Sequence, residues 1–154
     1  MELVRRFNAT RLVDSMMEDA QQMTLGTATA VLLIDDNAIQ AATRQTILRR
    51  AGFFVIAALN PVRALDQFRD DSFPARIGAV ITDHIMPGMS GAQFVRELRK
   101  ILPDIPVMVI SGLEEAEEEY ADLNVRFLLK PLSPDLLLSN LHYLLKQEEQ
   151  EGAA

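Results

Sequence analysis

The sequence predicts an α/β domain in which a doubly wound, five-stranded parallel sheet carries helices on both faces. Two observations support this fold class. From Ala30 onward, five short apolar runs alternate with segments that carry helix start and stop residues, and this alternation is typical of a parallel sheet. Several runs are apolar on consecutive positions, as expected of strands that are covered on both faces. The runs are AVLLI (30–34), FFVIAAL (53–59), IGAVIT (77–82), IPVMVI (105–110) and VRFLL (125–129).

The first helix is expected between the first two runs. Asn37 can cap its start, and Arg49 and Arg50 stand in its last turn ahead of Gly52. Cations in a last turn and a glycine just beyond it are typical of helix ends. This helix carries Ile39, Ala42, Thr46 and Ile47.

Three further helices have clear start signals, and a fourth segment has a weak pattern. Asn60, Ser90 and Ser133 are each placed to cap a helix, and prolines follow Asn60 and Ser133 at the first helical position. The segment LEEAEEEYADL (113–123) contains five glutamates and only a thin apolar stripe, which predicts a loosely held element. The stripe consists of Leu113, Ala116, Tyr120 and Leu123.

Composition limits the class of protein. The chain has 154 residues, 49% of them hydrophobic, which suits one ordinary domain with its own core. It contains no cysteine, which excludes disulfides and thiolate metal sites. A net charge of −7 disfavours nucleic-acid binding, and no apolar stretch approaches the roughly 20 residues that span a bilayer, so we expect a cytoplasmic protein. We assign residues 1–29 to a helical or disordered extension or linker, 30–147 to the domain and 148–154 to a polar tail.

Polar side chains follow four of the five apolar runs. Asp35 and Asp36 follow the first run, Asp83 the third, Ser111 the fourth and Lys130 the fifth. The carboxyl ends of parallel strands lie along one edge of the sheet, where α/β folds bind ligands. We therefore expect these side chains to meet in one crevice.

This set of side chains has a chemical requirement of its own. Three carboxylates roughly 4–6 Å apart repel one another by several kcal/mol in total, and Lys130 offsets only one charge. A hard divalent cation with oxygen ligands, Mg²⁺, suits the remainder. A bound metal can neutralise a phosphoryl group, and aspartate is a covalent phosphate acceptor in other proteins.

The same residues carry a family resemblance. Asp-Asp at 35–36, Asp83 followed by IMPGMSG, Ser-Gly at 111–112 and Lys-Pro at 130–131 occur in order, each directly after an apolar run. This series resembles the receiver domain of bacterial two-component response regulators, the CheY-like family, over about residues 30–147. The resemblance implies a flavodoxin-like fold with strand order 2-1-3-4-5.

The resemblance implies a role for each acidic residue. Asp83 is similar to the phosphoacceptor, which receives phosphate from the phosphohistidine of a partner kinase. Asp35 and Asp36 resemble the metal-binding pair, and the backbone carbonyl of Ile85 completes the protein ligands of Mg²⁺ together with Asp83. A surface carboxylate at Asp83 and a helix-capping role for Asp35 and Asp36 are the alternative interpretations.

The resemblance also implies roles for three other residues. Ser111 holds the position of the hydroxyl that binds the phosphoryl group and couples it to loop movement. Lys130, followed by Pro131 in a cis-prone position, resembles the lysine that pairs with a phosphoryl oxygen. Phe127 matches the switch aromatic, although a plain core or edge aromatic fits this position equally well.

The implied function is that of a phosphoacceptor switch, not an enzyme beyond self-catalysed phosphorylation and dephosphorylation of its aspartate. Its expected partners are a sensor histidine kinase or histidine phosphotransfer protein and a downstream protein, with no nucleic acid or membrane, and homodimers are conceivable. The domain can stand alone or belong to a hybrid histidine kinase. A Mg²⁺-dependent phosphohydrolase with an aspartyl-phosphate intermediate is disfavoured. Enzymes resembling the haloacid dehalogenases carry Asp-x-Asp after the first strand, whereas this chain has adjacent aspartates there.

Two departures from the family pattern stand out. Ile85 and Leu113, two residues after Asp83 and Ser111, are apolar at positions that in the family influence phosphate lifetime, which predicts a long-lived phosphorylated form. The stretch from Ser111 to Lys130 is also a few residues short, so the fourth helix is expected to be shortened or displaced. Asn124 is expected in the left-handed conformation there.

The two histidines receive no functional role from the sequence. His84, beside Asp83, is interpreted as a rim residue, and His142 as a surface residue of the last helix. The glutamate run is interpreted as a solvated helix start.

Overall fold

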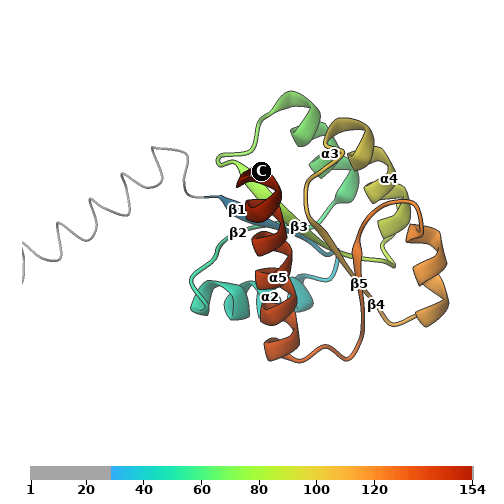
Figure 1. Ribbon diagram of the computed structural model, residues 1–154. Helices are drawn as coiled ribbons and strands as arrows, with labels where there is room; N and C mark the ends of the chain where they lie inside the picture. The colour runs from blue at the N-terminus through green and yellow to red at the C-terminus, as the bar shows by residue number, and fades with distance from the viewer. Residues whose placement is uncertain (1–28, 154) are drawn as a thin grey trace, which may run out of the picture.

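The structure, a computed structural model, describes residues 29–153, and side chains as far as residue 147. It confirms the predicted α/β fold class (Figure 1). The predicted N-terminal extension lies outside the described residues, apart from Thr29. The strands are β1 (Ala30–Ile34), β2 (Phe54–Ala58), β3 (Ile77–Asp83), β4 (Val107–Ser111) and β5 (Arg126–Leu129). The helices are α2 (Ala38–Arg50), α3 (Pro61–Asp70), α4 (Gly91–Ile101), the 3₁₀ helix η1 (Glu114–Tyr120) and α5 (Pro134–Ala153).

The sheet has the order β2-β1-β3-β4-β5, as the resemblance implies. Each neighbouring pair is parallel, so all five strands end at the same edge. β1 and β3 are adjacent, with Ile34 beside Thr82, and Asp83 at the end of β3 pairs with Ile110 of β4. β3, which ends in Asp83, is therefore the central strand, and β1, which Asp35 and Asp36 follow, lies next to it.

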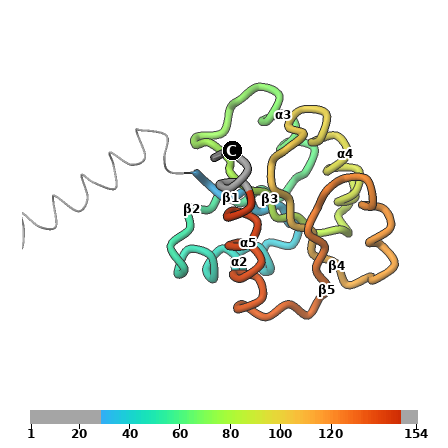
Figure 2. Tube along the Cα trace, viewed as in Figure 1, coloured from blue at the N-terminus to red at the C-terminus, as the bar shows by residue number. Residues whose placement is uncertain are grey.

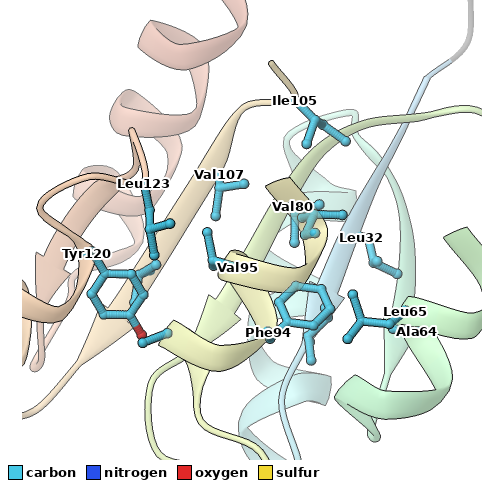
Figure 3. Close-up of a cluster of buried hydrophobic side chains, with 14 of the residues drawn as sticks. Leu32, Ala64, Leu65, Val80, Phe94, Val95, Ile105, Val107, Tyr120 and Leu123 are labelled. Carbon is cyan, nitrogen blue, oxygen red and sulfur yellow. The ribbon is translucent and has the colours of Figure 1, made fainter. Parts of the chain in front are cut away.

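Side chains that alternate along the strands build one core on each face of the sheet. Leu32 and Ile34 of β1 pack with α3, α4 and η1, whereas Val31 and Leu33 pack with α2 and α5. Figure 3 shows the first of these cores, in which Phe94 of α4 is fully buried. The carboxyl edge of the sheet, where the strands end, thus lies between α2 on one face and α4 with η1 on the other.

α2 begins as predicted but turns a different face to the sheet. The Asn37 side chain accepts hydrogen bonds from the backbone N–H groups of Ile39 and Gln40. Ile39 is nevertheless 80% exposed, and the buried residues of the helix are Ala41 and Leu48. The apolar residues noted in the sequence thus do not define the face that covers the sheet.

The segment between β4 and β5 confirms the prediction of a shortened fourth helix. It forms only the 3₁₀ helix η1, drawn in orange in Figure 2, before the chain returns to β5. Ala116 and Tyr120 are buried as predicted, while Leu113 is 40% exposed. Asn124 has a φ of 53°, in the left-handed region where it was expected.

α5 runs to Ala153 and so includes most of the residues assigned to a polar tail. Its start is helped by the Ser133 hydroxyl, which accepts a hydrogen bond from the backbone N–H of Leu136. Within residues 29–153, no helix combines the length and the apolar character that crossing a membrane requires.

Candidate functional site

The aspartates that follow β1 and end β3 lie together at the carboxyl edge of the sheet. Asp35, Asp36 and Asp83 each offer a carboxylate oxygen, and these three atoms lie within 4.8 Å of one another. Asp35 and Asp83 are buried, with exposed fractions of 0% and 3%, while Asp36 is exposed. The structure therefore brings together three carboxylates from positions far apart in the sequence.

The lysine predicted for the site reaches Asp83 from the end of β5. Its Nζ lies 3.1 Å from Asp83 Oδ1, and it also donates to Gln40 Oε1 of α2 at 3.5 Å. The Lys130–Pro131 peptide bond is cis. Lys130 thus links the acidic cluster to both α2 and the β5–α5 connection.

Three other predicted residues lie on β4, on β5 and in the loop after β3. Ser111 ends β4 one residue past the partner of Asp83; its hydroxyl accepts the N–H of Leu113 at 2.9 Å. Phe127 is half-buried on β5, and its ring centroid lies 5.7 Å from that of Tyr120. Ile85 lies in the loop after β3 with a side chain that is 67% exposed. Metal binding by its carbonyl stays a prediction.

Sequence reasoning missed a second cation in the site. Arg44 of α2 directs one guanidinium nitrogen, Nη1, to Asp35 Oδ2 and to Asp83 Oδ1, at 3.1 Å from each. Arg44 reaches the cluster because it lies three residues after Ala41 and four before Leu48, which are the buried residues of α2. A helical pattern anchored on Ala41 and Leu48 would have placed Arg44 on the sheet-facing side.

Asp35 is held by hydrogen bonds on both carboxylate oxygens. Oδ1 accepts the backbone N–H of Asn37 at 2.9 Å, and Oδ2 accepts from Arg44. Burial, followed by the hydrogen bond and negative charge shared with Asp83, raises the pKa of Asp35 from 3.8 to about 6. The Asn37 N–H and the Arg44 charge oppose this rise, so the site holds one carboxylate that is unusually costly to ionise.

The donor set fits a hard divalent cation. Three carboxylates against Arg44 and Lys130 leave a formal charge of −1 on the cluster. Octahedral Mg²⁺ binds oxygens at about 2.0–2.1 Å, so that its ligand atoms lie up to about 4.2 Å apart. Carboxylate oxygens within 4.8 Å of one another reach that spacing with small side-chain adjustments.

The interpretation of His84 as a rim residue is wrong. Its side chain is buried, with Nδ1 2.6 Å from the Tyr120 hydroxyl and Nε2 3.2 Å from a carboxylate oxygen of Glu119. Burial and then the charge of Glu119 raise the pKa of Tyr120 above its usual range, so its hydroxyl keeps its proton. In the neutral imidazole, Tyr120 then donates to Nδ1 while Nε2–H donates to Glu119. His84, the residue after Asp83, is thus bonded to two side chains of η1, Tyr120 and Glu119.

The end of β3 and Tyr120 of η1 both pack closely against the start of α4, at Gly91. A Cβ atom added to Gly91 would lie 2.5 Å from both the Asp83 carbonyl oxygen and the Tyr120 hydroxyl. The Gly91 N–H donates to the carbonyl of His84 at 2.7 Å. Glycine is needed here because backbone and side chains approach too closely for any larger residue.

The model of the response regulator receiver domain matches residues 31–142 of the chain. The chain belongs to this family. Receiver domains are signalling modules that accept phosphate, interact with histidine kinases or phosphotransfer proteins, and bind Mg²⁺ at an acidic pocket. The phosphoacceptor function predicted from the sequence is confirmed at the level of the family.

Curated relatives include both regulators and a kinase. The response regulator MprA of Mycobacterium tuberculosis (strain ATCC 25618 / H37Rv) is 29% identical over 127 residues, which cover 80% of this chain and 54% of MprA. The sensor kinase CckA of Brucella abortus (strain 2308) is 32% identical over 127 residues, covering 80% of this chain and 13% of CckA. The chain therefore spans about half or less of the length of these relatives.

Solved structures give the same fold. A response regulator receiver protein from Sinorhizobium medicae WSM419 has a TM-score of 0.68 at 30% identity, covering 77% of this chain and 95% of that one. A CheY-like receiver domain from Methanospirillum hungatei JF-1 has a TM-score of 0.72 at 20% identity, covering 80% and 98%. The second likeness bears on the fold alone.

Proposed function

We propose that Asp83 is the phosphoacceptor of this receiver domain. The observation that carries the proposal is the placement of its carboxylate, at the end of β3, 3.1 Å from Lys130 and grouped with two further aspartates. In the transfer, a carboxylate oxygen forms a bond to phosphorus as the P–N bond of the donor phosphohistidine breaks. The electron pair of that bond remains on the imidazole nitrogen. Lys130 then pairs with a phosphoryl oxygen and offsets its charge.

The proposed metal ligands are Asp35, Asp36, Asp83 and the backbone carbonyl of Ile85. When bound, Mg²⁺ supplies positive charge that lowers the repulsion between the carboxylate and the incoming phosphoryl group. Asp35 is oriented by the Asn37 N–H, and Asp36 is accessible from solvent. These contacts leave one fixed and one open acidic ligand beside the acceptor.

Ser111 and Phe127 are the proposed switch residues. The Ser111 hydroxyl is hydrogen-bonded to the backbone of Leu113, and binding a phosphoryl oxygen would require it to exchange these partners. Phe127 packs beside Tyr120 of η1, so a change at the β4 end would reach the face formed by η1 and β5. We propose that this face carries the output to a downstream protein.

We propose a histidine kinase or histidine phosphotransfer protein as phosphate donor. The domain works either alone or within a longer chain such as a hybrid kinase. The second architecture is supported by the relatives, because the match covers only 54% of MprA and 13% of CckA. Its chemistry is confined to self-catalysed phosphorylation and dephosphorylation of Asp83. Cytoplasmic location and homodimer formation stay predictions from the sequence.

Acetyl phosphate tests the proposed function directly. With Mg²⁺ present, intact-mass measurement should show the gain of one phosphoryl group, and the gain should disappear in Asp83→Asn and with EDTA. Asp66→Asn, an exposed acid of α3, is the matched control and should gain the group normally. Steady turnover of phosphate esters would instead indicate a phosphohydrolase, and phosphorylation of Asp83→Asn at the same level would refute the assignment.

The phosphorylated form is expected to be long-lived. Ile85 and Leu113, two residues after Asp83 and Ser111, are apolar, and apolar side chains cannot orient an attacking water by hydrogen bonding. Substituting Leu113→Asn should shorten the lifetime, measured by the decay of the phosphorylated mass after acetyl phosphate is removed. A half-life of seconds in the unmodified protein with Mg²⁺ would contradict this prediction.

A further inference from the structure

One guanidinium nitrogen bridges two of the proposed metal ligands. Arg44 Nη1 lies 3.1 Å from Asp35 Oδ2 and 3.1 Å from Asp83 Oδ1, and the arginine side chain is only 13% exposed. We propose that Arg44 is a resident counter-ion that competes with Mg²⁺ for these carboxylates and thereby sets the metal affinity of the site. The proposal rests on the proposed function of the same site.

The hydrogen bonds of the two aspartates show why competition follows. Both oxygens of Asp35 are engaged, one by the Asn37 N–H and the other by Arg44. Asp83 Oδ1 accepts from both Arg44 and Lys130. A metal ion that binds these oxygens must displace or share the bonds of Arg44, because each carboxylate oxygen has few lone-pair directions.

The charge of Arg44 acts in the same direction as its hydrogen bonds. With the arginine the cluster has a formal charge of −1, whereas Lys130 alone would leave −2. A divalent cation is therefore attracted less strongly than the three carboxylates alone would predict.

The structure offers Arg44 a place to move when it is displaced. A groove of about 390 Å³ between α2 and the start of α5 is lined by Arg44, Lys130 and the aliphatic residues Ile39 and Leu137. The guanidinium can turn toward this groove while its Cα stays fixed on α2. Displacement thus needs a change of side-chain rotamer and no movement of the helix.

Isothermal titration with Mg²⁺ at fixed ionic strength tests the proposal. Arg44→Met keeps the aliphatic stem and removes the charge, and it should bind Mg²⁺ at least about tenfold more tightly than the unmodified chain. The matched control, Arg49→Met, removes one charge from the exposed last turn of the same helix and should change the affinity by less than about twofold. Arg44→Lys retains the charge and should stay closer to the unmodified chain than to Arg44→Met. Equal affinity in Arg44→Met and the unmodified chain, or equal gains in Arg44→Met and Arg49→Met, would overturn the proposal.

A second measurement needs no variant. In the unmodified protein, the NMR signal of the Arg44 Nε–H should move toward the position of solvent-exposed arginines as Mg²⁺ is added. An Arg44 signal that stays in place while the Asp83 amide responds would refute competition. Either failure leaves the proposed function intact if Asp83 still gains phosphate, whereas absence of both Mg²⁺ binding and phosphorylation would refute the two together.

Discussion

Two regions of this domain are rich in acidic side chains, and they differ in how those side chains are arranged. At the carboxyl edge of the sheet, three aspartates place their oxygens within 4.8 Å of one another, next to Arg44 and Lys130. On η1, five glutamates follow one another along a single 3₁₀ helix, and all of them are exposed. The glutamates are Glu114, Glu115, Glu117, Glu118 and Glu119.

The difference shows that convergence and burial, more than the number of acids, produce the cluster that we propose as the metal and phosphate site. Asp35 and Asp83 are held by adjacent strands in a place closed to solvent, where charge interactions are strong. The glutamates of η1 are exposed to water, which screens their charges, and only Glu119 among them reaches a buried partner within the described residues, His84. What η1 contributes is Tyr120 and Glu119, which bond to His84 beside Asp83, the proposed acceptor.

The largest effect is expected at Gly91, where the two regions meet. An alanine Cβ there would lie 2.5 Å from the Asp83 carbonyl oxygen and the Tyr120 hydroxyl, so Gly91→Ala should lower the free energy of unfolding by about 2–3 kcal/mol. Gly112→Ala is the control, because an added Cβ meets nothing within 4 Å. Urea denaturation measures both, and equal stability of the two variants would refute the close packing of the regions.

Replacing one acid in each region should show which of the two regions binds the metal. Asp36→Asn removes the exposed carboxylate of the aspartate cluster, a proposed metal ligand, and should weaken Mg²⁺ binding by at least about tenfold, or about 1.4 kcal/mol. Glu115→Gln removes one charge from η1 and should leave the affinity within about twofold. Calorimetric titration decides, and a similar loss in both variants would mean that general acidity, not the aspartate site, attracts the metal.

The hydrogen bond between Tyr120 of η1 and His84, the residue after β3, can be removed by deleting one oxygen atom. Tyr120→Phe keeps the ring that packs beside Phe127 but leaves His84 Nδ1 without its partner, which should cost about 1–2 kcal/mol. Faster hydrogen exchange should follow in η1. Tyr143→Phe, at a tyrosine that is 48% exposed, should change stability by less than about 0.5 kcal/mol. Unchanged stability and exchange in Tyr120→Phe would show that packing alone positions η1.

The smallest effect is a pH dependence that belongs to the aspartate region. The pKa of Asp35 is raised from 3.8 to about 6 in the folded protein, so between these values the folded state holds a proton that the unfolded state has released. Stability of the metal-free protein should therefore fall as pH rises through this window, by on the order of 1 kcal/mol. Asp35→Asn should lose this decline in urea unfolding curves, while Asp66→Asn keeps it. An opposite slope would contradict the raised pKa.

The fold and the acidic residues could be predicted because each depends on local pattern. Apolar runs that end in Asp35, Asp83, Ser111 and Lys130 report both the strands and the edge at which they end. The short spacing from Ser111 to Lys130 likewise predicted a reduced fourth helix, which the structure has as η1. In these places local sequence and global fold agree.

The missed residues depend on side-chain reach between elements, which periodicity does not report. Arg44 is a charged residue on the sheet-facing side of α2, and a search for apolar residues selected Ile39, which is 80% exposed, in its place. His84 looked like a rim residue because its partners, Tyr120 and Glu119, lie more than thirty residues away on η1. Only the packed structure shows that these side chains meet.

The most direct test of the account replaces Mg²⁺ by Mn²⁺, which prefers similar oxygen ligands and broadens nearby NMR signals. At substoichiometric Mn²⁺, we expect the amide signals of Asp35, Asp36, Asp83 and Ile85 to broaden most strongly, while those of residues 114–119 broaden less. Broadening centred on the glutamates of η1, or spread evenly over the acidic surface, would contradict a single metal site at the end of β1 and β3.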